Sequence, residues 1–247
     1  MGNALRVKGE LDAAIEQFTQ ALSIKPDFNA AIGSYEKACV INPSYIKAYL
    51  NMGNALKQKG DLDAAIDRYK RAIKIKPDCA EGHYSIGVVL QEKSELNEVI
   101  DSYKWAIKFK PDYAEAHFNL GVIFQGRDDL DVSIENYKAA IEIKPNFGDA
   151  YSNIGIALQN KNELDAAVDI YKQALTVNPN HTESFINLEM LYFQLMETYK
   201  AHDQLSLIGN DKLNALLFEE PKHHIVQSIY YLLLGQTVIP LKNGCVE

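Results

Sequence analysis

Cysteine is scarce in this chain, and its few cysteines are not spaced for chemistry. Only three of the 247 residues are cysteine, namely Cys39, Cys79 and Cys245, and they lie far apart. An odd number without metal-ligand spacing predicts neither a disulfide framework nor a zinc site. We therefore expect reduced thiols in a cytoplasmic protein that carries no cofactor.

Positive charge is also in short supply. The chain has 25 Lys and Arg against 33 Asp and Glu, which gives a formal net charge of -8. A surface that follows a phosphate backbone needs clustered cations. The composition therefore predicts no nucleic-acid partner.

No apolar run is long enough to suggest a bilayer span. The most apolar stretch, residues 225–241, is interrupted by Gln227, Gln236 and Pro240, and it is too short and too polar to cross a membrane. Residues 1–14 lack the apolar segment of a signal peptide. We expect no membrane partner.

Motifs of catalysis are missing as well. The sequence has no nucleophile–base pattern, no glycine-rich phosphate loop and no catalytic carboxylate pair. We therefore predict that the chain is not an enzyme.

The sequence does contain a regular series of prolines. Five of the six prolines in the first 180 residues recur every 34 residues, at Pro43, Pro77, Pro111, Pro145 and Pro179. A fixed period of this length is typical of a helical repeat array. Within each unit apolar residues recur at steps of three and four, which indicates amphipathic helices.

Each unit carries the same motif before its proline. An apolar residue and a glycine come first, and a small residue and an aromatic four positions apart follow. The four units read Met52-Gly53, Ala65 and Tyr69; Ile86-Gly87, Val99 and Tyr103; Leu120-Gly121, Ser133 and Tyr137; and Ile154-Gly155, Ala167 and Tyr171. This pattern resembles the tetratricopeptide repeat. The resemblance implies an all-α fold, a right-handed α-solenoid of helix-turn-helix repeats, with turns near residues 59–63 and 161–165.

Departures from the period divide the chain into three parts. Residues 1–43 form a truncated first repeat and a half repeat, residues 44–181 form four full repeats, and residues 182–247 form a degenerate last repeat with C-terminal capping helices. We expect a single helix from Asn29 to Ile41 in the half repeat. In the last repeat Glu189 replaces the glycine, and we expect its helix to continue through Tyr199.

The two ends of the chain leave further alternatives open. Leu5, Ile15, Phe18 and Leu22 belong to a repeat whose first helix lacks its first half. Exposed apolar surface of this kind is costly, so we predict a homo-oligomer that forms through the N-terminal face. The alternative is that the chain is a fragment of a longer protein, and its last helices could then begin a second domain.

A row of amides marks the predicted binding surface. In this fold the residue before each apolar-glycine pair points to the concave side, and those residues are Asn51, Ser85, Asn119, Asn153 and Asn187. Asparagine is a poor helix former, and its amide suits an extended peptide backbone because it both donates and accepts. The row resembles the asparagine ladder of O-linked N-acetylglucosamine transferases, which implies a grip on peptide main chain. The alternative is that asparagine is common at this position without a bound peptide.

Apolar and aromatic side chains flank this row in the middle repeats. The predicted peptide-binding residues are Asn51, Asn54, Tyr84, Ser85, Val88, Phe118, Asn119, Val122, Asn153 and Asn187. An exposed patch of this kind indicates a partner site, although half-burial between neighbouring helices is the alternative. A carboxylate clamp is not predicted, because its basic positions hold Leu50, Glu81, Glu115 and Asp149.

The histidines His83 and His117 occupy one repeat position, where the other units have an aromatic residue. We expect them to pack like aromatic side chains rather than to share a metal, because packed helices lie about 10 Å apart.

These observations predict a scaffold for protein–protein interaction that binds an extended peptide or a partner helix in its concave groove. Two alternatives remain at this point. The chain could be the N-terminal, substrate-recruiting module of a larger glycosyltransferase-like enzyme, or a self-assembling structural protein.

Overall fold

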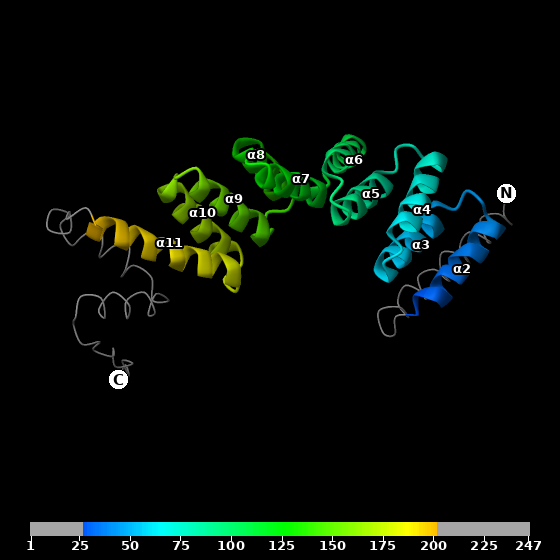
Figure 1. Cartoon of the computed structure of the whole chain (residues 1–247), viewed down its shortest axis with the longest axis horizontal. Helices are drawn as coiled ribbons and strands as arrows, with labels where there is room; N and C mark the ends of the chain where they lie inside the picture. Colours follow the sequence, from blue (N-terminus) through cyan, green and yellow to red (C-terminus); the bar gives the residue numbers. More distant parts are fainter. Residues whose placement is uncertain (1–26, 202–247) are drawn as a thin grey trace. The chain divides into compact units, whose positions relative to one another are not determined.

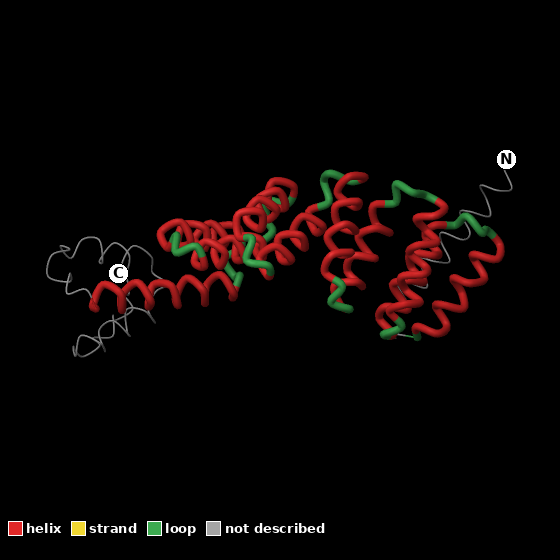
Figure 2. Tube along the Cα trace, turned by 45° about the horizontal axis from the view of Figure 1, so that its top comes forward, coloured by secondary structure: helices red, strands yellow, loops and turns green. Residues whose placement is uncertain are grey.

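The structure is a computed structural model that describes residues 27–201, apart from the side chains at 96–97 and 196–201. Within that range it has ten helices and no strand, as Figure 2 shows in red. They are α2 (Phe28–Ile41), α3 (Ile46–Lys59), α4 (Leu62–Ile75), α5 (Ala80–Glu92), α6 (Leu96–Phe109), α7 (Ala114–Gly126), α8 (Leu130–Ile143), α9 (Gly148–Asn160), α10 (Leu164–Val177) and α11 (Thr182–Ala201). The chain forms two compact units, residues 1–150 and 151–247, and each is described by itself.

In the first unit the helices follow one another as packed pairs. α3 contacts α4, α5 contacts α6 and α7 contacts α8, and consecutive pairs meet through α4 with α5 and α6 with α7 (Figure 1). The half repeat is the single helix α2, which packs on α3. This confirms the prediction of one helix over Asn29–Ile41 to within one residue. The Asp27 side chain begins α2 by accepting a hydrogen bond of 3.0 Å from the Ala30 N–H.

The prolines end the second helix of every repeat. The helices α2, α4, α6, α8 and α10 each end two residues before a proline of the 34-residue series. This spacing has a simple cause, because proline has no N–H for the helix and pushes the residue before it out of the helical region. The C-cap residue thus has an extended or nearly extended backbone, as at Lys76 with φ -132°.

The turn inside each repeat uses one left-handed residue at a constant position. Gly60 has φ 89°, and 34, 68 and 102 residues further on Ser94, Asp128 and Asn162 have φ 63°, 63° and 60°. The expected turns at residues 59–63 and 161–165 are thereby confirmed, between α3 and α4 and between α9 and α10. Glycine fits this backbone without strain, whereas the other three residues carry a side chain into it.

A column of buried tyrosines forms the centre of the repeats. Tyr69, Tyr103, Tyr137 and Tyr171 on the second helices have 0% exposed surface. Each ring lies against the glycine of its own first helix, where an added Cβ would overlap the ring at Gly53, Gly87, Gly121 and Gly155. The repeated glycine is therefore required by close packing with the ring.

The second unit contains most of α9, together with α10 and α11. Tyr171 of α10 packs on Gly155 of α9 in the usual way, and α10 contacts α11. The last helix continues for 20 residues to Ala201, so the prediction that it runs through Tyr199 is confirmed. The truncated first repeat and the capping helices that we expect lie in residues 1–26 and 202–247, outside the described residues.

Candidate peptide-binding face

All ten residues predicted to bind a peptide are half-buried. The eight of them on α3, α5 and α7 of the first unit are called the first-helix face, and Asn153 and Asn187 lie on α9 and α11 of the second unit. Two neighbours in the same rows differ, since Leu50 and Ser152 are 4% and 0% exposed and can reach no ligand. The alternative of half-burial between neighbouring helices thus describes part of this surface.

Asn119 lies at the centre of a hydrogen-bond network that joins two repeats. Its Nδ2 donates to the Tyr84 hydroxyl on α5 at 3.3 Å and to the Tyr103 hydroxyl on α6 at 3.2 Å. The Tyr103 hydroxyl in turn donates to Gln91 Oε1 at 2.8 Å. Asn119 therefore has a structural role that the sequence interpretation did not foresee.

This network also determines which way the Asn119 amide points. A tyrosine hydroxyl has one hydrogen, and Tyr103 gives it to Gln91, so its oxygen can only accept from Asn119. The two hydrogens of Asn119 Nδ2 are thus used within the protein. What remains of the amide is Oδ1, a hydrogen-bond acceptor.

The sequence analysis missed the hydrogen-bond partners of the buried tyrosines, which are Gln91, Gln125 and Gln159. Each lies 12 residues before its tyrosine, and each accepts the tyrosine's hydroxyl hydrogen, as in the 2.6 Å bond from Tyr137 to Gln125. The signal available in the sequence was a glutamine that recurs every 34 residues, 12 positions before each tyrosine. A buried hydroxyl needs such a partner.

In the first full repeat the buried tyrosine hydroxyl has a different partner. Lys57 stands at the glutamine position, and the Tyr69 hydroxyl donates instead to Asn54 Oδ1 at 2.7 Å. Ser85, which stands where Asn119 stands one repeat later, also hydrogen bonds to Tyr69. The Asn54 amide therefore uses its oxygen within the protein, whereas the Asn119 amide uses its nitrogen. Asn54 Nδ2 is directed away from the Tyr69 hydroxyl.

Tyr84 and Phe118 pack in equivalent aromatic pairs. Tyr84 lies 4.7 Å from Tyr113, and Phe118 lies 4.8 Å from Phe147, measured between ring centroids. A lysine covers the second ring of each pair, with Lys110 Nζ at 4.6 Å from Tyr113 and Lys144 Nζ at 4.6 Å from Phe147. The two aromatic residues of the first-helix face therefore pack against the next repeat.

Carboxylates lie at the starts of the first helices. Glu81 and Glu115 lie in the first turns of α5 and α7, and Glu115 pairs with Lys144 at 3.5 Å. Burial is the main cause that raises the pKa of Tyr84, and the charge of Glu115 adds to it. Burial raises the pKa of Tyr113 in the same way, with smaller effects from Tyr84, Glu81 and Glu115.

His83 packs as an aromatic side chain, as expected. His83 lies 5.4 Å from Phe109 and 6.0 Å from Trp105, and its Nε2 lies 3.0 Å from the Pro77 carbonyl oxygen. His117 Nε2 lies 3.2 Å from the Pro111 carbonyl oxygen, and the Tyr49 hydroxyl reaches Pro43 likewise at 3.3 Å. Each side chain thus ties a first helix to the turn that precedes it.

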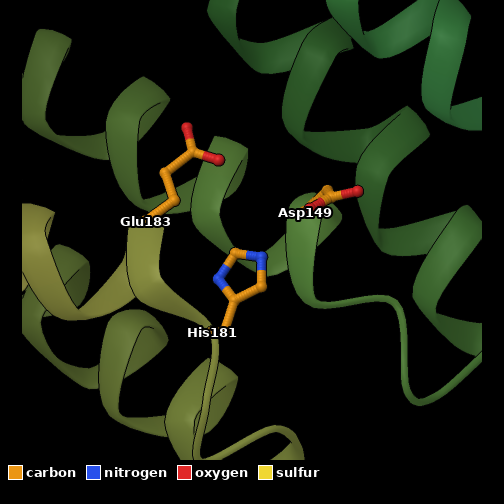
Figure 3. Close-up of side chains that lie close together, drawn as sticks. All are labelled: Asp149, His181 and Glu183. Atoms are coloured by element: carbon orange, nitrogen blue, oxygen red, sulfur yellow. The ribbon is translucent and has the colours of Figure 1, made fainter.

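Figure 3 shows three further side chains with the chemistry of metal ligands, Asp149, His181 and Glu183. His181 has a local role, because its Nδ1 accepts a hydrogen bond from the Ser184 N–H at 3.2 Å at the start of α11. Asp149 belongs to the first compact unit and the other two belong to the second, so the three do not define a site.

Comparison with known proteins agrees with the repeat architecture. The family described as TPR repeat matches residues 27–60, 53–94, 92–126 and 127–162, and the tetratricopeptide repeat matches residues 148–181 and 1–28. No curated protein matches the chain.

Among the described residues, no helix is long and apolar enough to cross a membrane.

Solved structures with a similar fold are tetratricopeptide repeat proteins. Two crystal structures of MamA are 30% and 29% identical to this chain, each with a TM-score of 0.59, and they cover 66% and 71% of it and 95% and 96% of their own chains. YrrB, described as a TPR protein with an unusual peptide-binding site, is 22% identical, with a TM-score of 0.57, and covers 79% of this chain and 97% of its own. The matched repeats and the buried tyrosine–glycine packing lead to one conclusion: the chain belongs to the tetratricopeptide repeat family.

Proposed function

We propose that this protein is a non-enzymatic scaffold that binds an extended peptide of a partner protein along the first-helix face. The orientation of the Asn119 amide is the observation that carries the proposal. Its Nδ2 is used within the protein and its Oδ1 remains as an acceptor, which suits a backbone N–H of a peptide. Asn119 is half-buried, so a bond formed there is partly shielded from water.

A second amide of the face complements this acceptor. Asn54 uses its Oδ1 for Tyr69 and so offers an N–H donor toward a peptide carbonyl. In the second unit, which is described by itself, Asn187 uses Nδ2 to donate to the Ser152 hydroxyl at 3.3 Å. An extended peptide presents both donors and acceptors along its length, and the face offers partners for both.

Two resemblances support this proposal. The asparagine row resembles the ladder of O-linked N-acetylglucosamine transferases, and YrrB is described as having a peptide-binding site. A partner held by main-chain bonds requires no cofactor, metal or nucleic acid. The free thiols of Cys39 and Cys79 agree with the cytoplasm, where thiols stay reduced.

The test separates the ligand contact of Asn119 from its structural bonds. Peptides selected on the full chain from a random-peptide display library provide the probe, and fluorescence anisotropy measures their affinity. Asn119→Ser keeps one donor for Tyr103, as Ser85 does for Tyr69, but it loses the bond to Tyr84 and removes Oδ1. We expect the affinity to fall about two- to tenfold, the loss of one hydrogen bond to the peptide, and the unfolding midpoint to fall only slightly, because of the lost bond to Tyr84.

Gln58→Ala is the matched control, because it removes an exposed amide from the last turn of α3. It should leave the affinity unchanged. Equal affinities for Asn119→Ser and the unmodified chain would rule out a peptide contact at Asn119, and failure to select any peptide would contradict the proposed function.

A further inference from the structure

The last described helix carries an exposed apolar face. Ile186, Met190 and Phe193 on α11 are 49%, 65% and 45% exposed, and their spacing of four and three residues places them on one side of the helix. The equivalent residues of α5, which are Tyr84, Val88 and Gln91, are all half-buried. The α11 face is therefore more open than its counterpart in an internal repeat.

In the internal repeats part of this face is covered by the chain that follows. Tyr84 packs on Tyr113 and accepts from Asn119, both in the next repeat. Gln91 accepts from Tyr103 on the second helix of its own repeat. What covers the corresponding face of α11 should therefore also come from later in the sequence.

Two residues of α11 differ from their counterparts in the internal repeats, and they indicate what kind of segment covers this face. Glu189 stands at the position of Gly155, and Phe193 stands at the position of Gln159. The glycine makes room for a buried tyrosine ring and the glutamine accepts its hydroxyl hydrogen. Because both are replaced together, the cover has no tyrosine to accommodate, and Phe193 favours an apolar partner instead.

We propose that residues 211–220 of this chain dock on the face formed by Ile186, Met190 and Phe193. Leu213, Leu216 and Leu217 supply apolar side chains at spacings of three and four residues, and Asp211, Glu219 and Glu220 supply the polar ones. This pattern matches the spacing on α11.

The connection is long enough for such docking. Residues 202–210 lie between α11 and this segment, and nine extended residues reach about 30 Å. Met190 lies 11 residues before Ala201, which is about 16 Å along a helix. The segment can therefore turn back beside α11 without strain.

Thiol labelling of the full chain tests this docking. The native cysteines are replaced by Cys39→Ser, Cys79→Ala and Cys245→Ser, and a single reporter is introduced as Met190→Cys. The control in the same background is Gln173→Cys, an exposed position on α10. We expect the thiol at position 190 to react with an aromatic disulfide reagent about tenfold more slowly than the control, since reaction then requires local opening.

A second set of variants identifies the cover. Replacing Leu213, Leu216 and Leu217 by aspartate should raise the reaction rate at position 190 to that of the control, while circular dichroism of both proteins confirms that they are folded. Equal rates for the two reporters before this change would overturn the proposal. Protection that disappears on dilution would assign the cover to a second copy, and protection that survives the aspartates would assign it to another segment; both would also overturn it.

Discussion

At the scale of single residues, the packing of glycine against tyrosine determines what each repeat tolerates. A Cβ at position 121 would lie 2.6 Å from the Tyr137 ring, and the hydrogen bond to Gln125 holds that ring in place. Gly121→Ala should therefore lower the free energy of unfolding by about 1–3 kcal/mol, the usual cost of overpacking. Urea unfolding measures the loss.

Gly33 provides the matched control for that change. It lies inside α2 as an ordinary helical residue, and a Cβ there would meet nothing within 4 Å. Gly33→Ala should instead raise the free energy of unfolding by about 0.5–1 kcal/mol, because alanine favours the helix. Equal effects of the two substitutions would contradict the role of the tyrosine ring.

At the scale of the elements, the left-handed residue between paired helices is a point of strain. Ser94 adopts φ 63° where the first repeat has Gly60, and a side chain in that region costs about 1 kcal/mol. Ser94→Gly should raise the free energy of unfolding by up to that amount, as measured by urea unfolding.

Asn162→Gly is the comparison for this turn, because asparagine tolerates the left-handed region better than serine does. Its gain should be smaller than that of Ser94→Gly. The reverse order would show that something other than the backbone angle decides the stability of these turns.

The helices were predictable from the sequence because local signals determine where they begin and end. The prolines end the second helices, and the half period between Pro26 and Pro43 leaves room for the one helix α2. The exposure of the first-helix face was less predictable, because it depends on the next repeat. Leu50 and Ser152 share rows with Tyr84 and Phe118 in the sequence and yet are buried.

The orientation of Asn119 was also beyond the sequence. It depends on a chain of hydrogen bonds between three repeat positions. The amide of the following repeat donates to the tyrosine, and the tyrosine donates to the glutamine. A period shows that such positions recur, but the direction of each hydrogen bond follows only from which partners are in reach.

At the scale of the whole molecule, the buried tyrosines predict loss of stability in alkali. Burial is the main cause that raises the pKa of Tyr69, Tyr103 and Tyr171. Up to the ordinary tyrosine pKa of about 10 these groups are protonated in both states. Above it the unfolded chain releases protons first, so the free energy of unfolding should fall as pH rises beyond about 10.

Tyr171→Phe tests that explanation, because phenylalanine has no proton to release. Urea unfolding at a series of pH values above about 10 should show a slope reduced by about 1.4 kcal/mol per pH unit, the contribution of one proton. An unchanged slope would show that other groups cause the alkaline loss.

The aromatic cluster of α5 and α6 has a spectroscopic consequence. Trp105, 44% exposed and stacked 5.6 Å from Phe109, is the only tryptophan in the chain, so fluorescence excited selectively at tryptophan reports on that cluster alone. In repeat proteins each unit is stabilised by its neighbours, and terminal units unravel before internal ones. Emission from Trp105 therefore reports the unfolding of an interior repeat, whereas ellipticity averages over every helix. The difference between the two midpoint temperatures measures how far unfolding spreads inward from the ends.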